Sequence, residues 1–173
     1  MLNGKVGDLQ TADNDGRSRQ VLLFGASNLV LGWPAIIRQL QQQMARRNVN
    51  KTVPTADVVI VNPEHYAVAL KYDTSRAEAP FVVAKGIDEM ALYIKAVAAK
   101  HRIETVTLPP LARAIYNTSQ VQQQIPAQLY QAVSQVLNYV LQLNAFRDGR
   151  RQAPPRFPNE VVVPSHLSEV SAT

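Results

Sequence analysis

Short apolar stretches alternate with amphipathic stretches along the middle of the chain, a pattern typical of α/β domains. Residues 56–61, with the sequence ADVVIV, are mostly β-branched, which predicts a strand buried on both faces. Three further strands are predicted at residues 66–72, 80–86 and 104–108. Apolar residues at helical spacing predict helices at residues 88–102, 109–117 and 126–143.

Segments of different character flank this middle part. Pro34 begins an amphipathic stretch that predicts a linker helix over residues 34–53. Residues 1–33 are expected to be a flexible N-terminal segment, and the Pro- and Arg-rich residues 147–173 a disordered tail. The expected fold class is therefore α/β, with a small four-stranded sheet surrounded by helices in residues 54–146.

The predicted helix at 88–102 has acidic residues at its start and basic residues at its end. Asp88 and Glu89 open it, and Lys100, His101 and Arg102 close it. This order complements the helix dipole. We therefore expect Asp88 and Glu89 to stabilise the helix rather than to form a catalytic carboxylate pair.

The net charge of +5 and the pI of about 9.7 allow an acidic partner such as nucleic acid or anionic lipid. A basic nucleic-acid-binding module is therefore one alternative, and it would use Arg46, Arg47, Lys51, Arg150 and Arg151. Aromatic residues make up only 6% of the chain and do not alternate with these basic residues. We therefore favour a solvated basic surface and expect no nucleic-acid partner.

Common catalytic and cofactor motifs are missing from the sequence. His65, His101 and His166 lie far apart, and the chain has no cysteine, so no metal site is expected. The stretch DVVIVNPEHY superficially resembles the motif with which amino-group methyltransferases hold a flipped base. It lacks the second proline, and no glycine-rich cofactor loop precedes it. A methyltransferase is therefore a weak alternative, and no cofactor is expected.

The Asn62-Pro63 pair, at the end of the first predicted strand, allows an unusual reaction. Ordinary deamidation needs the N–H of the residue after asparagine, and proline has none. The side-chain nitrogen of Asn62 can instead attack its own backbone carbonyl, with the nitrogen of Pro63 as leaving group. His65 is close enough in sequence to relay a proton. The pair therefore raises the hypothesis of self-cleavage, although most Asn-Pro pairs are inert turns.

Four blocks of the chain resemble the cytoplasmic domain of the FlhB/SctU family, the export-apparatus switch proteins of flagella and of type III secretion. The blocks are ADVVIVNPEHYAVALKYD, APFVVAKG, PPLARAIY and IPAQLYQAVSQVLNYV. The family motif is Asn-Pro-Thr-His, and its Asn–Pro bond breaks autocatalytically. The resemblance implies that Asn62 cyclises, Pro63 leaves and His65 assists. Such a protein is not an enzyme, because the cleavage is a single turnover.

This chain departs from the family motif at Glu64, where the family has threonine. A carboxylate there either acts as a base toward the Asn62 amide or opposes the negative charge that builds up during attack. The sequence leaves both effects of Glu64 open. Because Asn62 and Pro63 are intact, cleavage is the expectation.

The resemblance also implies partners and a location. The partners are export-gate membrane proteins, a hook-length control protein, and exported flagellar substrates with their chaperones. Family members carry an N-terminal membrane domain that this sequence does not show. We therefore expect a cytoplasmic protein, peripheral at the inner face of the bacterial plasma membrane. The alternative is a truncated remnant without function in export.

Overall fold

The computed structural model describes residues 32–63 and 65–169, so the segment predicted to be flexible lies almost wholly outside them. The chain divides into two units between Ala45 and Arg46, and the second unit contains the sheet. Residues 32–52 are helical, as predicted for the linker helix. None of the helices in the described ranges has the length and apolar composition needed to cross a bilayer.

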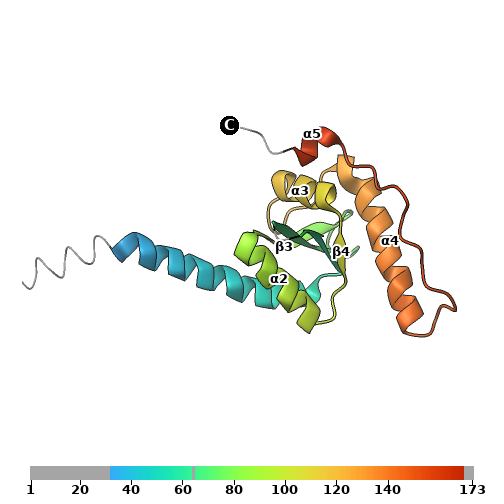
Figure 1. Ribbon diagram of the computed structural model, residues 1–173, viewed down its shortest axis with the longest axis horizontal. Coiled ribbons are helices and arrows are strands. Elements are labelled where there is room, and N and C mark those ends of the chain that lie inside the picture. Colours follow the sequence, from blue (N-terminus) through green and yellow to red (C-terminus); the bar gives the residue numbers. More distant parts are fainter. Residues whose placement is uncertain (1–31, 64, 170–173) are drawn as a thin grey trace, which may run out of the picture. The chain divides into compact units, whose positions relative to one another are not determined.

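The second unit has a four-stranded mixed sheet, and the predicted α/β fold class is confirmed (Figure 1). Its strands are β1 (Val58–Asn62), β2 (Tyr66–Lys71), β3 (Phe81–Ile87) and β4 (Thr105–Thr107). Its helices are α2 (Asp88–Lys100), α3 (Pro109–Thr118), α4 (Tyr130–Arg147) and α5 (Ser165–Ser168), with short 3-10 turns at Val53–Thr55 and Ala127–Leu129. All four strands and the three long helices therefore lie where the apolar pattern predicted them, within a few residues.

The strand order is β3-β2-β1-β4. β1 pairs with β2 in antiparallel fashion and with β4 in parallel fashion, so β1 is an interior strand. β2 pairs with β3 in antiparallel fashion. The two interior strands, β1 and β2, are joined directly by the hairpin that contains the Asn-Pro pair.

Each face of the sheet is covered by its own helices. Val58 and Ile60 of β1 point into a core formed with α3 and α4. Val59 and Val61, on the opposite face, pack with α2 and with Val49 and other residues before β1. Because successive side chains of a strand alternate between faces, this double coverage explains the continuous β-branched run.

The C-terminal tail differs from its prediction. Residues 151–164, before α5, have no regular secondary structure, yet some of them pack against the domain. Phe157 stacks edge-on against Tyr139 of α4, with ring centroids 5.0 Å apart. Val161, Val163 and Leu167 pack on the core beside α3 and α4. A tail without periodicity can therefore still bury isolated apolar residues on a preformed core.

Candidate functional site

The Asn62-Pro63 pair lies in the tight turn between β1 and β2. Asn62 is the last residue of β1 and faces Tyr66, the first residue of β2. The backbone N–H of His65 donates a hydrogen bond to the carbonyl oxygen of Asn62, with an N–O distance of 3.1 Å. Proline at the second position suits such a four-residue turn. Pro63 and His65 are exposed, whereas Glu64 lies outside the described residues.

The backbone that enters the turn is held firmly. The N–H of Leu108, just after β4, donates to the carbonyl oxygen of Val61 at 3.0 Å. Val61 is buried, and Asn62 is half-buried. Strand pairing on both sides of β1 therefore restricts the backbone of Asn62 up to the bond with Pro63.

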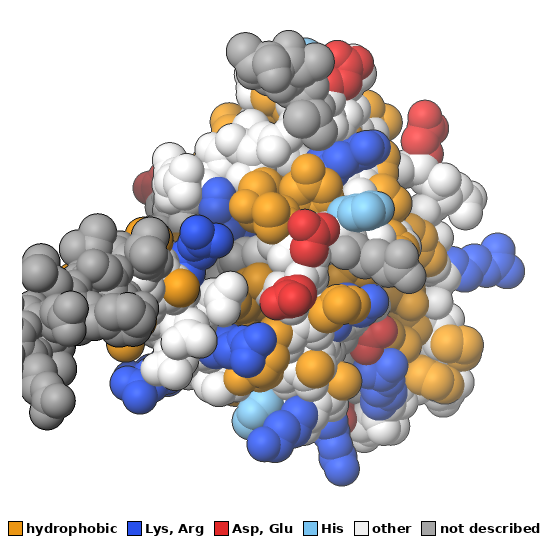
Figure 2. Space-filling view, turned by 60° about the vertical axis from the view of Figure 1, so that its left-hand side comes forward, with side chains coloured by type: hydrophobic (Ala, Val, Ile, Leu, Met, Phe, Trp, Pro, Cys, Tyr) orange, Lys and Arg blue, Asp and Glu red, His pale blue; other side chains and the backbone are white. Residues whose placement is uncertain are grey.

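His65 contacts the start of α2. Its carbonyl oxygen accepts a hydrogen bond from the N–H of Asp88 at 3.0 Å. Its Nδ1 lies 3.8 Å from the Asp88 carboxylate, and both side chains are mostly exposed. Figure 2 shows one face of the molecule, on which acidic side chains lie beside a histidine. The structure thus adds a carboxylate to the predicted site.

A glycine allows α2 to start close to the sheet. A Cβ atom on Gly86, near the end of β3, would lie 2.4 Å from Cγ of Met90 in α2. No larger residue fits there without a shift of the helix. Because α2 follows β3 directly, its first residue Asp88 is brought to the turn that carries His65.

The start of β2, just after the turn, packs against α3 through two aromatic rings and a lysine. Tyr66 packs edge-on against Tyr116 of α3, with ring centroids 5.1 Å apart. Nζ of Lys85 lies 4.6 Å from the centroid of the Tyr116 ring and donates to the carbonyl oxygens of Tyr116 and Ser119. Burial lowers the pKa of Lys85 below its ordinary value. These contacts tie β2 and β3 to the C-terminal end of α3.

Three of the four residues predicted for the site, Asn62, Pro63 and His65, thus meet in one described turn. Sequence reasoning assigned Asp88 to the helix dipole and missed its contact with His65. A pairing of β2 with β3 that places Tyr66 opposite Ile87 brings position 88 to the turn. Only knowledge of that register could have revealed the contact from the sequence.

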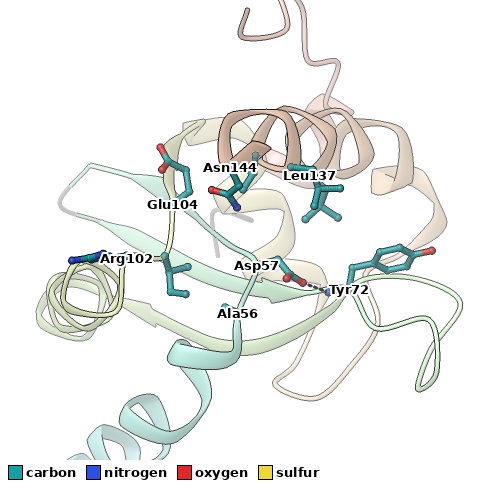
Figure 3. Close-up of a pocket in the computed structure, with 10 residues that line it drawn as sticks. Ala56, Asp57, Tyr72, Arg102, Glu104, Leu137 and Asn144 are labelled. Atoms are coloured by element: carbon teal, nitrogen blue, oxygen red, sulfur yellow. Dashed lines mark hydrogen bonds between the residues drawn. The ribbon is translucent and has the colours of Figure 1, made fainter. Parts of the chain in front are cut away.

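Two surface cavities, which the sequence did not predict, lie elsewhere along α4. The first, of about 190 Å³, has Asp57, Glu104 and Asn144 among the residues that line it (Figure 3). There the carboxylate of Asp57 accepts a hydrogen bond from the N–H of Tyr72 at 2.7 Å. The second cavity, of about 270 Å³, shares Tyr72, Leu137 and Leu141 with the first. The two cavities therefore adjoin along one apolar edge of α4.

The basic residues considered for nucleic-acid binding are partly engaged within the domain. Arg46 lies over the Tyr93 ring, 5.3 Å from its centroid. Arg150 pairs with Asp148 at 2.6 Å, and Arg151 donates to Gln142. Within residues 32–63 and 65–169, no three potential metal-ligating side chains cluster together.

Comparison with known proteins identifies the family. The sequence model of the FlhB HrpN YscU SpaS family matches residues 34–140, more than half of the chain. The flagellar biosynthetic protein FlhB of Salmonella typhimurium is 48% identical over 131 residues, which are 76% of this chain and 34% of that protein. FlhB of Bacillus subtilis is 44% identical over 104 residues, 60% of this chain and 29% of that protein. The chain therefore spans about a third of the length of these relatives.

Solved structures agree with this match. The cytoplasmic domain of FlhB from Shewanella putrefaciens is 50% identical and superposes with a TM-score of 0.66, covering 70% of this chain and 94% of that one. A mutated EscU C-terminal domain is 26% identical, with a TM-score of 0.52 over 53% of this chain and 92% of that one. The methyltransferase alternative is left without support. From the family match, the identity to flagellar relatives and the shared fold, the chain belongs to the FlhB HrpN YscU SpaS family.

Proposed function

We propose that this chain is a switch domain of a type III protein export apparatus and cleaves itself between Asn62 and Pro63. Nδ2 of Asn62 attacks the backbone carbonyl carbon of the same residue and closes a five-membered ring. The bond between that carbon and the nitrogen of Pro63 then breaks. One proton passes from Nδ2 to the departing nitrogen, which leaves a succinimide on residues 1–62 and a free amine on Pro63. No atoms are gained or lost.

The observation that carries this proposal is the hydrogen bond from the His65 N–H to the carbonyl oxygen of Asn62, at 3.1 Å. That carbonyl is the group under attack. Negative charge develops on its oxygen as the ring closes, and a donor already in place stabilises this charge without reorganisation. The turn therefore supplies a backbone oxyanion contact in addition to holding the Asn-Pro pair.

The side chain of His65 supports the proton transfer. It is exposed and lies in the same turn, where histidine is the residue type most often used as a general acid or base. The half-buried position of Asn62 limits the motion of the attacking group, which favours intramolecular reaction. In the EscU C-terminal domain, an adjacent asparagine and proline have each been replaced with alanine for structure determination.

The position of the cut lets the two products stay together. β1 belongs to the N-terminal product and lies between β2 and β4, which both belong to the C-terminal product. Separation would expose an interior strand that is buried on both faces. Cleavage therefore opens the surface turn and leaves the core of the domain intact.

The proposed role follows from the family. The domain acts in export of flagellar proteins, at the inner face of the bacterial plasma membrane. Its partners are export-gate membrane proteins, a hook-length control protein, and exported substrates with their chaperones. Opening of the turn changes which class of substrate is exported.

Intact mass under denaturing conditions tests the cleavage. We expect two fragments, residues 1–62 and 63–173, from the purified chain and a single uncut mass from Asn62→Ala. Asn159→Ala, which replaces an exposed asparagine of the tail, is the matched control and should be cut normally. An uncut wild-type chain would contradict the proposal and favour a remnant without function. Glu64→Thr then shows whether the departure from the family motif blocks the reaction.

A further inference from the structure

Asp88 contacts His65 through both its backbone and its side chain. The Asp88 N–H donates to the His65 carbonyl oxygen at 3.0 Å, and the His65 N–H donates to the Asn62 carbonyl oxygen at 3.1 Å. His65 is therefore fixed at both of its peptide groups. The Asp88 carboxylate lies 3.8 Å from Nδ1 of the His65 imidazole. Among the described residues, no other ion pair involves His65 or Asp88.

The backbone of Asp88 is unusual for the start of a helix. Its φ angle is +45°, a left-handed value that glycine adopts freely and that asparagine and aspartate tolerate better than most other residues. The N-cap residue of α2 is Ile87, and no side-chain hydrogen bond caps the start of the helix. The left-handed backbone is compatible with an aspartate but does not by itself require the approach of its carboxylate to His65, and Glu89 also supplies a negative charge to the first turn.

We propose that Asp88 is a positioning residue for His65 in the self-cleavage reaction. This inference rests on the proposed cleavage at Asn62-Pro63. The carboxylate limits rotation of the imidazole at the turn. An ordered imidazole is available for proton transfer in a larger fraction of the molecules, so cleavage is faster.

The size of the effect follows from the exposure of the pair. Exposed ion pairs are weak, so we expect removal of the carboxylate to slow cleavage by about two- to fivefold at low ionic strength. The difference in cleavage rate between the wild type and the Asp88 variant should become smaller at high salt, where charge interactions are screened. A role of Asp88 in helix stability alone would change Tm without changing the rate of cleavage or the motion of the His65 ring.

Three variants separate positioning from stability. Asp88→Asn keeps the shape of the side chain, and Asp88→Gly removes it while relieving the left-handed backbone. Glu89→Gln is the matched control, because it removes one charge from the next residue of the same helix. Cut and uncut masses are followed over time after cell-free synthesis of each chain, and Tm is measured in the uncut Asn62→Ala background.

We expect both Asp88 variants to cleave more slowly than the wild type, while Glu89→Gln keeps the wild-type rate. Asp88→Gly should keep or raise Tm although it slows cleavage. Equal rates for all four chains, or equal losses for Asp88→Asn and Glu89→Gln, would overturn the proposal.

A measurement that does not depend on cleavage completes the test. In the Asn62→Ala chain, NMR relaxation of the His65 ring should report greater motion after Asp88→Asn and no change after Glu89→Gln. Unchanged His65 motion in the Asp88 variant would contradict positioning. If the wild-type chain is never cut, the proposed self-cleavage fails, and the NMR comparison alone decides whether Asp88 orders His65.

Discussion

Solvent exposure changes abruptly where β1 meets the turn. Val58, Val59 and Ile60 have no exposed surface, whereas Pro63 and His65, a few residues later, are exposed. The strand is held by partners on both edges and by a core on both faces. The turn is held by two backbone hydrogen bonds and by the exposed contact between the side chains of His65 and Asp88.

This contrast suggests that the strands provide the stability of the domain, whereas the turn provides the groups for the proposed reaction. Most of the buried apolar surface lies in the strands, so the proposed cut in the turn should remove little of the free energy of folding. The groups of the proposed reaction lie in the turn, where backbone hydrogen bonds orient them without burying them. Substitutions in the strands should therefore change stability strongly, and substitutions near the surface should change it little.

The largest loss of stability is expected from Ile60→Ala. Ile60 is fully buried in the core formed with α3 and α4, and such truncations cost about 2–5 kcal/mol. Urea denaturation of the uncut Asn62→Ala background measures the change, with Ile36→Ala, at an exposed position, as control. If Ile60→Ala lowered the free energy of unfolding by less than about 1 kcal/mol, β1 would not contribute to stability as its burial predicts.

An intermediate loss is expected from Lys85→Met. The substitution leaves the carbonyl oxygens of Tyr116 and Ser119 without their donor, which costs about 1–3 kcal/mol. Lys51→Met, at an exposed position, should cost much less. Equal losses for the two variants in urea denaturation would show that the hydrogen bonds of Lys85 contribute nothing.

The stability difference at Lys85 should also depend on pH. Burial lowers the pKa of Lys85 below its ordinary value of 10.5, so the unfolded chain holds this proton more tightly than the folded chain. The wild type should therefore gain stability relative to Lys85→Met as the pH rises from the lowered pKa toward 10.5. Urea denaturation at neutral and alkaline pH measures this difference, and a constant difference would contradict it.

The smallest effect is expected from Arg147→Ala. Arg147 pairs with Glu104 at 2.7 Å, and about half of the arginine side chain is exposed (54%). Such surface pairs contribute about 0–1 kcal/mol and less at high salt. Thermal unfolding at two salt concentrations measures the loss of stability. Arg150→Ala, which removes a more exposed arginine, is the comparison. A loss above about 2 kcal/mol would show that this edge of α4 contributes as much as the core.

Much of the fold could be predicted because each long element carries its own local pattern. The β-branched run of β1 and the apolar stripes of α2 and α4 reflect burial directly. The contacts of the C-terminal tail could not be predicted because Phe157, Val161 and Val163 have no periodicity, and their burial depends on a surface made by distant helices.

The amino-acid sequence by itself determined the positions of the strands and helices, the Asn62-Pro63 pair and the resemblance to the family. These features are local in the chain, so neighbouring residues contain the information. Only the tertiary structure decided that β1 is an interior strand, that the His65 N–H meets the Asn62 carbonyl, and that Asp88 reaches His65. The physical reason is that these contacts depend on strand register and on the close approach of α2 at Gly86, which no local pattern of residues specifies.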